Sequence, residues 1–465
     1  MNSRRCAALT VLLGAALLGG CVTSNRTPAP GAAAVCPDSP LRVVLASPAT
    51  LGSSGRIVIK DAAGTTADTI DLAAARQTRL VGGVSLRYQP VAVDGATVTI
   101  RPRVTLGYGK TYTVTIEPAV LGGQAVEPWS FSTRAAPPPA TADDLTVAAD
   151  GTGDFCTVQG AIDFIPAGRP ERTTILVRRG IYNELVNIPQ GKDRITLRGE
   201  DRHQSVIAGL NNAVLNPRHR TMMGVTANDI VIQNLTLRNL TPKGGRQAET
   251  LQLRGERCFL VDDDFYSFQD TLQLNGGVDV KNCFIAGDVD FIWGSGTVFF
   301  DRCTLRALNN GFLVQSRNGA NRLGYIFSDC TIETAPGATH VVLARIHPKG
   351  YPYSNVAFLH CRLGPGIVPE GWELDQGTDR DRLLAPPPAS AAAAAARPEG
   401  RESALIDNAQ PAPNVHFWEY QSVDLSGQPA DVSHRLPCSR QLTEDEAAPL
   451  SDATKVLGGW AHALP

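Results

Sequence analysis

Two carboxylates and two primary amides lie close together within residues 247–294 of this 465-residue chain. Gln247, Gln269, Asp270 and Asp290 stand beside short apolar segments that are typical of β-strands. A carboxylate can attack a carbonyl carbon, and a second carboxyl group can move protons. Side-chain amides can donate hydrogen bonds to the oxyanion that then forms. This inventory predicts the cleavage of an ester without a catalytic Ser, His or metal.

Three motifs in this stretch resemble those of the pectin methylesterase family. They are Gln247-Ala-Glu, Gln269-Asp-Thr-Leu and Asp290-Phe-Ile-Trp-Gly, and the family's own pattern is close to Q-A-V-A-L, Q-D-T-L-Y and D-F-I-F-G. Gly151-Thr-Gly-Asp-Phe and Gly180-Ile-Tyr-Asn-Glu are similar to further landmarks of the family. The resemblance covers residues 143–465. It implies a right-handed parallel β-helix and an enzyme that removes methyl groups from pectin.

The resemblance also implies a role for each polar residue. Asp290 is the nucleophile that forms an acyl-enzyme, and Asp270 is the general acid that later activates water. Gln247 and Gln269 are the oxyanion donors. Arg345, within an L-A-R-I-H sequence that matches the family's L-G-R-P-W, is the cation beside Asp290. Because neighbouring carboxyl groups do not ionise equally, we expect a protonated Asp270 and an ionised Asp290. The scheme needs no cofactor.

The residues expected to bind the substrate depart in part from the family. Trp293 and Trp372 occupy family-like positions, but His347 replaces a Trp, and Glu249 stands where an apolar residue is usual. The catalytic residues are therefore kept, whereas part of the expected sugar-stacking surface is changed. Besides pectin hydrolysis, two alternatives stay open. One is an esterase or thioesterase for a different ester, and the other is a non-catalytic β-helix that binds glycans.

Five cysteines recur in one local setting, each followed by short apolar residues. The intervals between them vary from 20 to 31 residues: Cys258, Cys283, Cys303, Cys330 and Cys361. A repeated apolar setting with variable spacing is typical of a solenoid, in which strands repeat and loops vary. Stacked coils would bury these residues either as a ladder of thiols or as disulfides between coils, with Cys283–Cys303 the preferred pair. Cys36 and Cys156 form a second candidate pair.

Residues 36–134 have the alternating apolar pattern of several short strands. Arg56-Ile-Val-Ile-Lys and Thr111-Tyr-Thr-Val-Thr-Ile are examples, with Gly-rich turns between such segments. This pattern predicts a β-sandwich and resembles bacterial Ig-like domains of surface proteins. We expect a spacer or wall-facing module here, because the segment contains no catalytic constellation. The Pro-rich residues 135–142 are expected to be a linker.

The first 21 residues have the pattern of an export signal. Two arginines precede an apolar core that is too short to span a membrane, and the signal ends in a lipobox-like Leu-Gly-Gly-Cys21. We therefore expect lipid attachment at Cys21, a flexible tether over residues 22–35, and a place in the cell envelope, most consistent with the outer membrane. The net charge of −2 favours no nucleic-acid partner, and we expect a monomer.

Four further segments have local signals of their own. Residues 157–165 are expected to form a short helix that caps the solenoid, and helices are expected to begin at Thr443 and Ser451. Residues 384–400 are a low-complexity loop rich in Ala and Pro. The acidic run at residues 262–264 is interpreted as a solvated loop rather than a Ca²⁺ site, so no metal site is expected.

Overall fold

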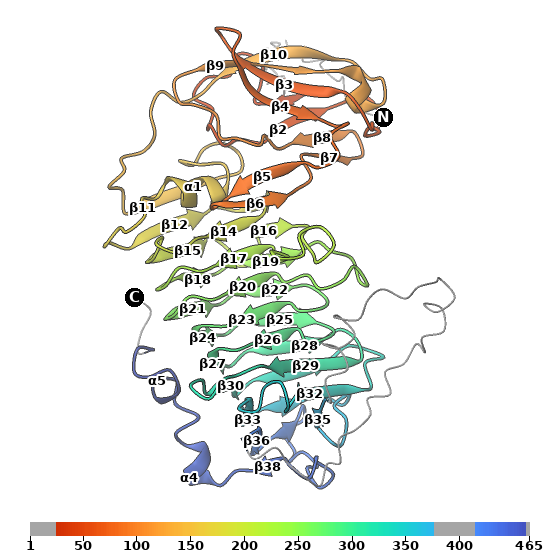
Figure 1. Cartoon of the computed structure of the whole chain (residues 1–465), viewed down its shortest axis with the longest axis vertical. Coiled ribbons are helices and arrows are strands. Elements are labelled where there is room, and N and C mark those ends of the chain that lie inside the picture. Colours follow the sequence, from red (N-terminus) through yellow and green to blue (C-terminus); the bar gives the residue numbers. More distant parts are fainter. Residues whose placement is uncertain (1–24, 376–413, 462–465) are drawn as a thin grey trace, which may run out of the picture.

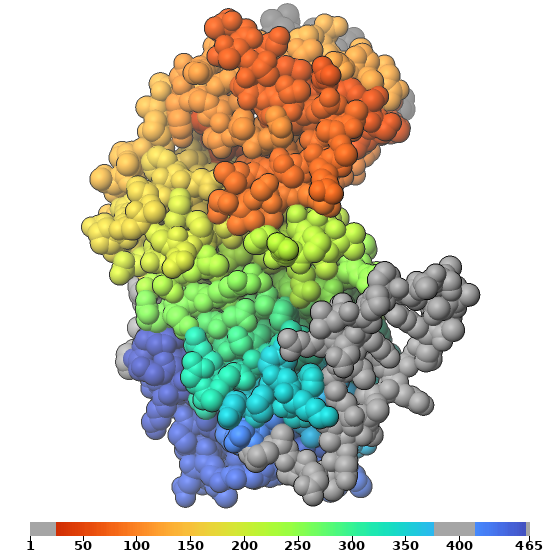
Figure 2. Space-filling view, viewed as in Figure 1, coloured from red at the N-terminus to blue at the C-terminus, as the bar shows by residue number. Residues whose placement is uncertain are grey.

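The computed structural model describes residues 25–375 and 414–461. A β-sandwich is seated on the first coils of a long parallel β-helix (Figures 1 and 2). The all-β architecture with a smaller N-terminal sandwich, expected from the sequence, is confirmed. Cys21 and the low-complexity loop at 384–400 lie outside the described residues.

Three parallel sheets form the walls of the β-helix, because each coil contributes one strand to each wall. The first sheet contains β11 (Asp144–Val147), β12 (Thr173–Val177), β15 (Ile195–Gly199), β18 (Val231–Gln233), β21 (Cys258–Val261), β24 (Gly277–Lys281), β27 (Thr297–Asp301), β30 (Gly324–Ser328), β33 (Asn355–Leu359), β36 (His416–Tyr420) and β38 (Arg440–Gln441). The second contains β13 (Gly180–Asn183), β16 (Ser205–Gly209), β19 (Thr236–Asn239), β22 (Asp264–Tyr266), β25 (Phe284–Gly287), β28 (Thr304–Ala307), β31 (Thr331–Thr334), β34 (Arg362–Leu363) and β37 (Val423–Asp424).

The third sheet is the one that displays the polar motifs. Its strands are β14 (Val186–Ile188), β17 (Met223–Val225), β20 (Leu251–Leu253), β23 (Leu272–Leu274), β26 (Ile292–Gly294), β29 (Gly311–Ser316), β32 (Val341–Ile346) and β35 (Trp372–Leu374). Leu272, Ile292 and Val314 occupy one register position on successive coils, and none of them is exposed to solvent. Such inward apolar ladders hold each coil on the next.

The cysteine ladder differs from the one expected. Cys283 and Cys303 each follow a residue with positive φ at the turn between the first and second sheets, and so do Cys330 and Cys361. Cys258 instead begins β21, so it lies at a different turn. In the coil of Cys258, Asp263 takes the ladder position. It follows Asp262, whose φ is 56°.

The acidic run is not a solvated loop. Asp263 is completely buried, and its carboxylate accepts hydrogen bonds from the backbone N–H groups of Leu235 and Val261 at 2.9 and 3.1 Å. The neighbouring Asp264 is buried too and pairs with Arg202 at 2.7 Å. The interpretation was wrong because the turn of a coil directs one of three consecutive residues into the core, where only a hydrogen-bonded carboxylate is tolerated.

Of the two alternatives for the ladder, the disulfide between Cys283 and Cys303 is wrong, since both residues are free thiols. Each thiol instead donates to a carbonyl of the preceding coil, Cys283 to Leu260 at 3.5 Å and Cys303 to Val280 at 3.5 Å. The ladder is therefore one of buried thiols, the alternative that the sequence left open. Free buried Cys packs as a small apolar residue.

The sandwich consists of two four-stranded antiparallel sheets and a hairpin. The sheets are β1 (Arg26–Thr27), β2 (Leu41–Val44), β8 (Thr97–Ile100) and β7 (Val91–Asp94), and β10 (Val126–Ser132), β9 (Thr111–Ile116), β3 (Arg56–Asp61) and β4 (Thr66–Asp71). The hairpin is β5 (Thr78–Val81) and β6 (Val84–Arg87), and a short 3-10 helix, η1, spans Pro118–Leu121. Trp129 and Phe131 lie in the core between the sheets.

The prediction of a flexible tether over residues 22–35 is wrong for residues 25–35, the part that the structure describes. Arg26 and Thr27 pair with β2, and the backbone N–H groups of Gly31 and Val35 donate to Ser130 and Ser132 at 2.8 and 3.0 Å. Pairing with both sheets makes residues 26–35 part of the sandwich. The polar, Pro- and Ala-rich composition suggested a tether because backbone pairing leaves no mark on composition.

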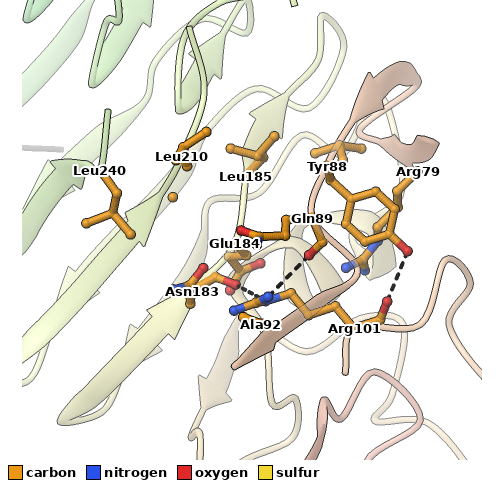
Figure 3. A pocket seen from close by; sticks show the side chains of 12 residues that line it. Arg79, Tyr88, Gln89, Ala92, Arg101, Asn183, Glu184, Leu185, Leu210 and Leu240 are labelled. Carbon is orange, nitrogen blue, oxygen red and sulfur yellow. Dashed lines mark hydrogen bonds between the residues drawn. The ribbon is translucent and has the colours of Figure 1, made fainter. Parts of the chain in front are cut away.

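Hydrogen bonds join the sandwich to the β-helix. Arg101 of the sandwich donates from Nε to the carbonyl of Asn183 in the β-helix at 2.9 Å, beside a cavity of about 130 Å³, while its Nη1 donates to the carbonyl of Gln89 within the sandwich at 3.3 Å (Figure 3). The side chain of Asn216 makes reciprocal bonds of 2.9 Å with the backbone of Arg87 at the end of the hairpin. The two domains are therefore attached to each other by specific contacts as well as by the linker.

A helix near the junction is capped from both domains. Helix α1 (Val158–Phe164) confirms the helix expected at 157–165, with Thr157 as its N-cap. Asp38 of the sandwich accepts hydrogen bonds from the N–H groups of Cys156 and Thr157 at 2.8–3.1 Å. Cys36, Asp38 and Cys156 place their ligand atoms within 4.8 Å of one another, so the second candidate cysteine pair is brought together, although both thiols are free.

Glu184 of the family-like Gly-Ile-Tyr-Asn-Glu segment supports the same helix. Its carboxylate accepts from the N–H groups of Val158 and Gln159 at 2.8 and 3.0 Å, and burial raises its pKa to about 7. An acid whose pKa is raised by folding contributes stability that is present below its unfolded pKa and is lost as the pH rises through the folded value.

We therefore expect Glu184→Gln to change how stability depends on pH. The free energy of unfolding of the wild type, relative to that of the variant, should fall by about 3 kcal/mol between pH 4.5 and 8, given the shift of the Glu184 pKa from 4.5 to about 7. Urea unfolding across this range measures the difference. The exposed Glu127→Gln is the matched control, and an equal pH dependence in both variants would contradict the assignment.

Two short helices at the end of the chain pack against the first sheet (Figure 1). They are α4 (Glu444–Ala447) and α5 (Ala453–Val456). Thr443 caps α4 with a capping box, as expected, whereas α5 is capped by Asp452 and not by Ser451. No helix in the described ranges is both long and apolar enough to cross a bilayer.

Candidate active site

The outer face of the third sheet carries a ladder of polar and aromatic side chains. Strand pairing places these residues at one position on successive coils: Gln252, Gln273, Trp293, Gln315, Arg345 and Glu373. Side chains alternate along a strand, so a residue whose neighbours face the core must itself face outward. The outer face therefore collects polar groups from residues more than a hundred positions apart.

Three acids are stacked just before the strands of this sheet. Glu249, Asp270 and Asp290 each stand two residues before paired core positions on β20, β23 and β26. Neighbouring parallel strands are about 4.8 Å apart, so each acid lies one coil from the next. Asp270 and Asp290 have φ angles of 68° and 48° in the left-handed region, a strained conformation that is common at functional sites.

Arg345 holds Asp290 as the sequence predicted. Its Nε donates to Oδ1 at 2.9 Å and its Nη2 to Oδ2 at 2.5 Å, which is a bidentate pair. Nη1 donates to Asp375 at 3.2 Å, and the guanidinium lies 4.5 Å from the ring centroid of Phe312. Asp290 is 5% exposed, so the pair is almost fully desolvated. This bidentate contact pairs the Asp290 carboxylate with a cation and fixes its orientation.

Asp270 has a different environment. Burial raises the pKa of Asp270 well above its ordinary value, Glu249 and Asp290 raise it further, and Arg220 and Arg317 oppose them. Arg220 donates from Nη2 to Oδ2 of Asp270 at 2.8 Å. A general acid must hold a proton, and the raised pKa suits Asp270 to this role. A nucleophile needs an oriented carboxylate, and the ion pair with Arg345 suits Asp290 to that role.

Gln269 directly precedes Asp270, Gln247 lies two residues before Glu249 on the preceding coil, and both are half-buried. The carbonyl of Gln247 accepts from Ala213 at 2.9 Å, and that of Gln269 accepts from Ala248 at 3.2 Å, which fixes both backbones on adjoining coils. No hydrogen bond to either side-chain amide is recorded among residues 25–375 and 414–461. Both amides are therefore available to a bound ligand, which is consistent with donors for an oxyanion.

Aromatic side chains lie on both sides of Arg317. Its guanidinium is 4.5 Å from the ring of Trp293 and 5.7 Å from that of Tyr351. The half-buried His347 packs edge-on against Tyr351, with ring centroids 6.4 Å apart. Trp293, three residues after Asp290, is 8% exposed, and His347 stands two residues after Arg345. Tyr351 is a further aromatic residue beside Arg317, which the sequence motifs did not identify.

Trp372 is not a substrate-binding residue in this structure. It is 2% exposed and packs in the core, 4.9 Å from the ring of Phe417 and 5.7 Å from that of Phe358. It pairs with Ala344, whereas its neighbour Glu373 pairs with the outward Arg345. The prediction was wrong because the alternation of a strand assigns the inner face to Trp372 and the outer face to Glu373.

Sequence reasoning missed Arg220, Arg317 and Tyr351. Arg220 precedes Asp270 by 50 residues and belongs to no motif. The only signal that pointed to it was Glu249, a charge in place of the usual apolar residue, because a buried carboxylate needs a partner. Arg220 is that partner, with Nε 2.7 Å from Oε1 of Glu249.

Comparisons with known proteins identify both domains. Residues 144–383 match the family described as Pectinesterase, and residues 22–133 match the family described as Bacterial Ig-like domain. Pectinesterase 31 of Arabidopsis thaliana is 30% identical over 323 residues, which is 66% of this chain and 90% of that protein. A pectinesterase of Ralstonia nicotianae is 31% identical over 321 residues, covering 60% of this chain and 78% of the relative.

Solved structures share the fold of the β-helix. Pectin methylesterase from carrot superimposes with a TM-score of 0.56 at 21% identity, over 71% of this chain and 96% of the carrot chain. A pectin methylesterase solved in complex with a hexasaccharide has a TM-score of 0.53 at 23% identity, over 70% of this chain and 99% of that one.

Proposed function

Because this chain belongs to the pectinesterase family, we propose that it hydrolyses the methyl esters of pectin to free carboxylates and methanol. The observation that carries this proposal is the stacking of two unlike acids, Asp290 in a bidentate pair with Arg345 and Asp270 with a raised pKa. Both lie beside an exterior ladder that carries Trp293. A related pectin methylesterase has been solved with a hexasaccharide, which supports a polysaccharide substrate.

The geometry supports a two-step reaction. In the first step the Asp290 carboxylate attacks the ester carbonyl, and the amides of Gln247 and Gln269 donate to the oxyanion. The bond to the methoxy group breaks, and Asp270 gives its proton to the departing methanol. In the second step Asp270 takes a proton from water, the hydroxide attacks the acyl-enzyme, and Asp290 is released as a carboxylate. Protons balance over the cycle, and no cofactor takes part.

Tyr351, which is half-buried, is the aromatic surface that we assign to a sugar ring, whereas Trp293 is 8% exposed and its ring centroid lies 5.4 and 4.5 Å from the guanidinium groups of Arg220 and Arg317. Arg317 lies within 6 Å of both rings and carries a positive charge suited to the free carboxylates of partly demethylated pectin. Tyr351 takes this role in place of Trp372, whose ring is buried. The family has Trp where this chain has His347 beside Tyr351. The smaller ring offers less surface for stacking on a sugar, so we expect weaker binding of the polymer.

Methanol release from highly methylated pectin tests the activity directly. An acyl thioester assayed in parallel distinguishes the alternative esterase or thioesterase, which the changed aromatic residues favour. Cleavage of pectin alone supports the proposal, and cleavage of the thioester alone refutes pectin as the substrate. If the folded chain cleaves neither but is retained on immobilised pectin, the non-catalytic glycan-binding alternative is correct.

We also propose that Cys21 carries a lipid anchor that places the enzyme at the cell envelope, most consistently the outer membrane. The support is the sequence Leu-Gly-Gly-Cys21 after a short apolar segment. Cys21→Ser should move the protein from the membrane fraction to the soluble or precursor pool, because the several acyl chains of a lipoprotein hold stably where one chain would not. Immunoblots of the two fractions measure this, with Cys36→Ser as the control. An unchanged distribution of the Cys21 variant would refute lipidation.

A further inference from the structure

Glu249 extends the pair of reacting acids into a stack of three. Its side chain is completely buried, and both of its oxygens accept from Arg220 Nε, at 2.7 and 3.0 Å. The same guanidinium donates from Nη2 to Asp270 at 2.8 Å. Arg220 therefore bridges the acid of one coil and the acid of the next, on the side of Asp270 away from Asp290.

The charges that face Asp270 come from several coils. Glu249 and Asp290 are the acids, and Arg220 and Arg317 are the cations. Arg317 also donates from Nε to Gln315 at 2.9 Å and lies over Trp293. A lone Arg220 hydrogen-bonded to Asp270 would favour the carboxylate form of Asp270, which cannot act as an acid. Glu249 supplies the negative charge that balances Arg220.

We propose that Arg220 and Glu249 are positioning residues that act through Asp270. Arg220 fixes the direction of the Asp270 carboxyl group, and Glu249 balances the charge of Arg220 so that Asp270 keeps the proton it gives to methanol. This inference rests on the proposed function. It explains why an acid replaces the apolar residue of the Q-A-V-A-L motif at position 249.

The charges around Asp270 agree with this assignment. The pKa of Asp270 is raised first by burial and next by Glu249, ahead of the opposing effect of Arg220. The pKa of Glu249 is raised as well, by burial, and the charge of Arg220 opposes that rise. Asp270 lies between two acids of the stack, Glu249 and Asp290, and both raise its pKa. Glu249 has only one acidic neighbour in the stack, Asp270.

The pH profile of kcat/KM on pectin tests the inference. Its alkaline limb reports the loss of the Asp270 proton. Glu249→Gln removes one negative charge at nearly constant shape, so this limb should move toward acid by about one pH unit. The charge-balanced double variant Arg220→Gln/Glu249→Gln should return the limb close to that of the wild type, while kcat falls because Asp270 is no longer oriented. An unmoved limb in Glu249→Gln, or the same shift in both variants, would overturn the proposal.

Infrared titration provides a readout that needs no substrate. The band of a protonated carboxyl group that is present in the wild type and absent in Asp270→Asn reports the Asp270 proton. It should persist to higher pH in the wild type than in Glu249→Gln. The assignment is refuted if the wild-type band disappears in the pH range of an exposed Asp. It is also refuted if Glu249→Gln removes the band and Asp270→Asn does not. The first outcome needs no variant, so it stands even if the single variants fold poorly.

The two readouts also separate the inference from the proposed function. If the wild type releases no methanol from pectin but the Asp270 band behaves as expected, the proposed function fails and the charge balance stands. If methanol is released but Glu249→Gln leaves the band and the pH limb unchanged, only the inference fails.

Discussion

Asp290→Asn should reduce methanol release from pectin by roughly 10³-fold or more, the scale on which enzymes lose activity when the nucleophile is removed. The amide is nearly the same size as the carboxylate, but it is not a usable nucleophile. Arg345 would still find an oxygen acceptor, so the fold should be retained. Initial rates at saturating pectin measure the effect, and circular dichroism confirms the fold.

Asp288→Asn is a matched control for this variant, since Asp288 lies two residues away on the same coil, is buried, and has no role in the scheme. Its rate should stay within a few-fold of the wild type. If Asp290→Asn kept most of the wild-type rate with an unchanged spectrum, covalent catalysis by Asp290 would be wrong.

Arg345→Met should affect both stability and activity. Arg345 is 4% exposed and its guanidinium makes two hydrogen bonds to Asp290, so its removal leaves that carboxylate buried without its cation. Breaking a buried pair in this way costs about 3–5 kcal/mol. Asp290 is then no longer held in its attacking orientation, so methanol release should fall as well. Urea unfolding measures the first effect and the pectin assay the second.

Two further variants separate charge from geometry. Arg345→Lys keeps the positive charge but loses the planar bidentate contact, so it should be more stable than Arg345→Met and still slow. The double variant Asp290→Asn/Arg345→Met contains no unpaired charge at this pair and should recover part of the lost stability. If Arg345→Met unfolds at the same urea concentration as the wild type, the ion pair does not have the energetic role assigned to it.

Sequence motifs were informative where the chemistry is local. Asp270 and Asp290 each lie in a contiguous motif, and the pairing of Asp290 with Arg345 followed from a third motif. The short helix at α1 was also predictable, because Thr157 and the apolar residues after it are local signals. Such features depend on neighbours in the chain, which a sequence displays directly.

Register was the feature that motifs predicted poorly. Cys258 resembles the other repeated cysteines, yet Asp263 takes the ladder position of its coil. Trp372 resembles a sugar-binding residue, yet it packs against Phe417. In both cases a small displacement along the chain decides which face or turn a residue occupies, because side chains alternate with a period of two.

The sequence by itself determined the fold class, the two domains and the acids and amides that can cleave an ester, because short strands, recurring apolar settings and contiguous motifs are local properties. Only the tertiary structure decided which charges surround Asp270. Arg220 reaches Asp270 across 50 residues of sequence, and Glu249 reaches it through Arg220. Coils of a β-helix differ in length because their loops vary, so separation along the chain does not reveal which residues stack one coil apart. The stacking of parallel strands then places charges within hydrogen-bonding distance, and it is this contact that distinguishes an acid from a nucleophile.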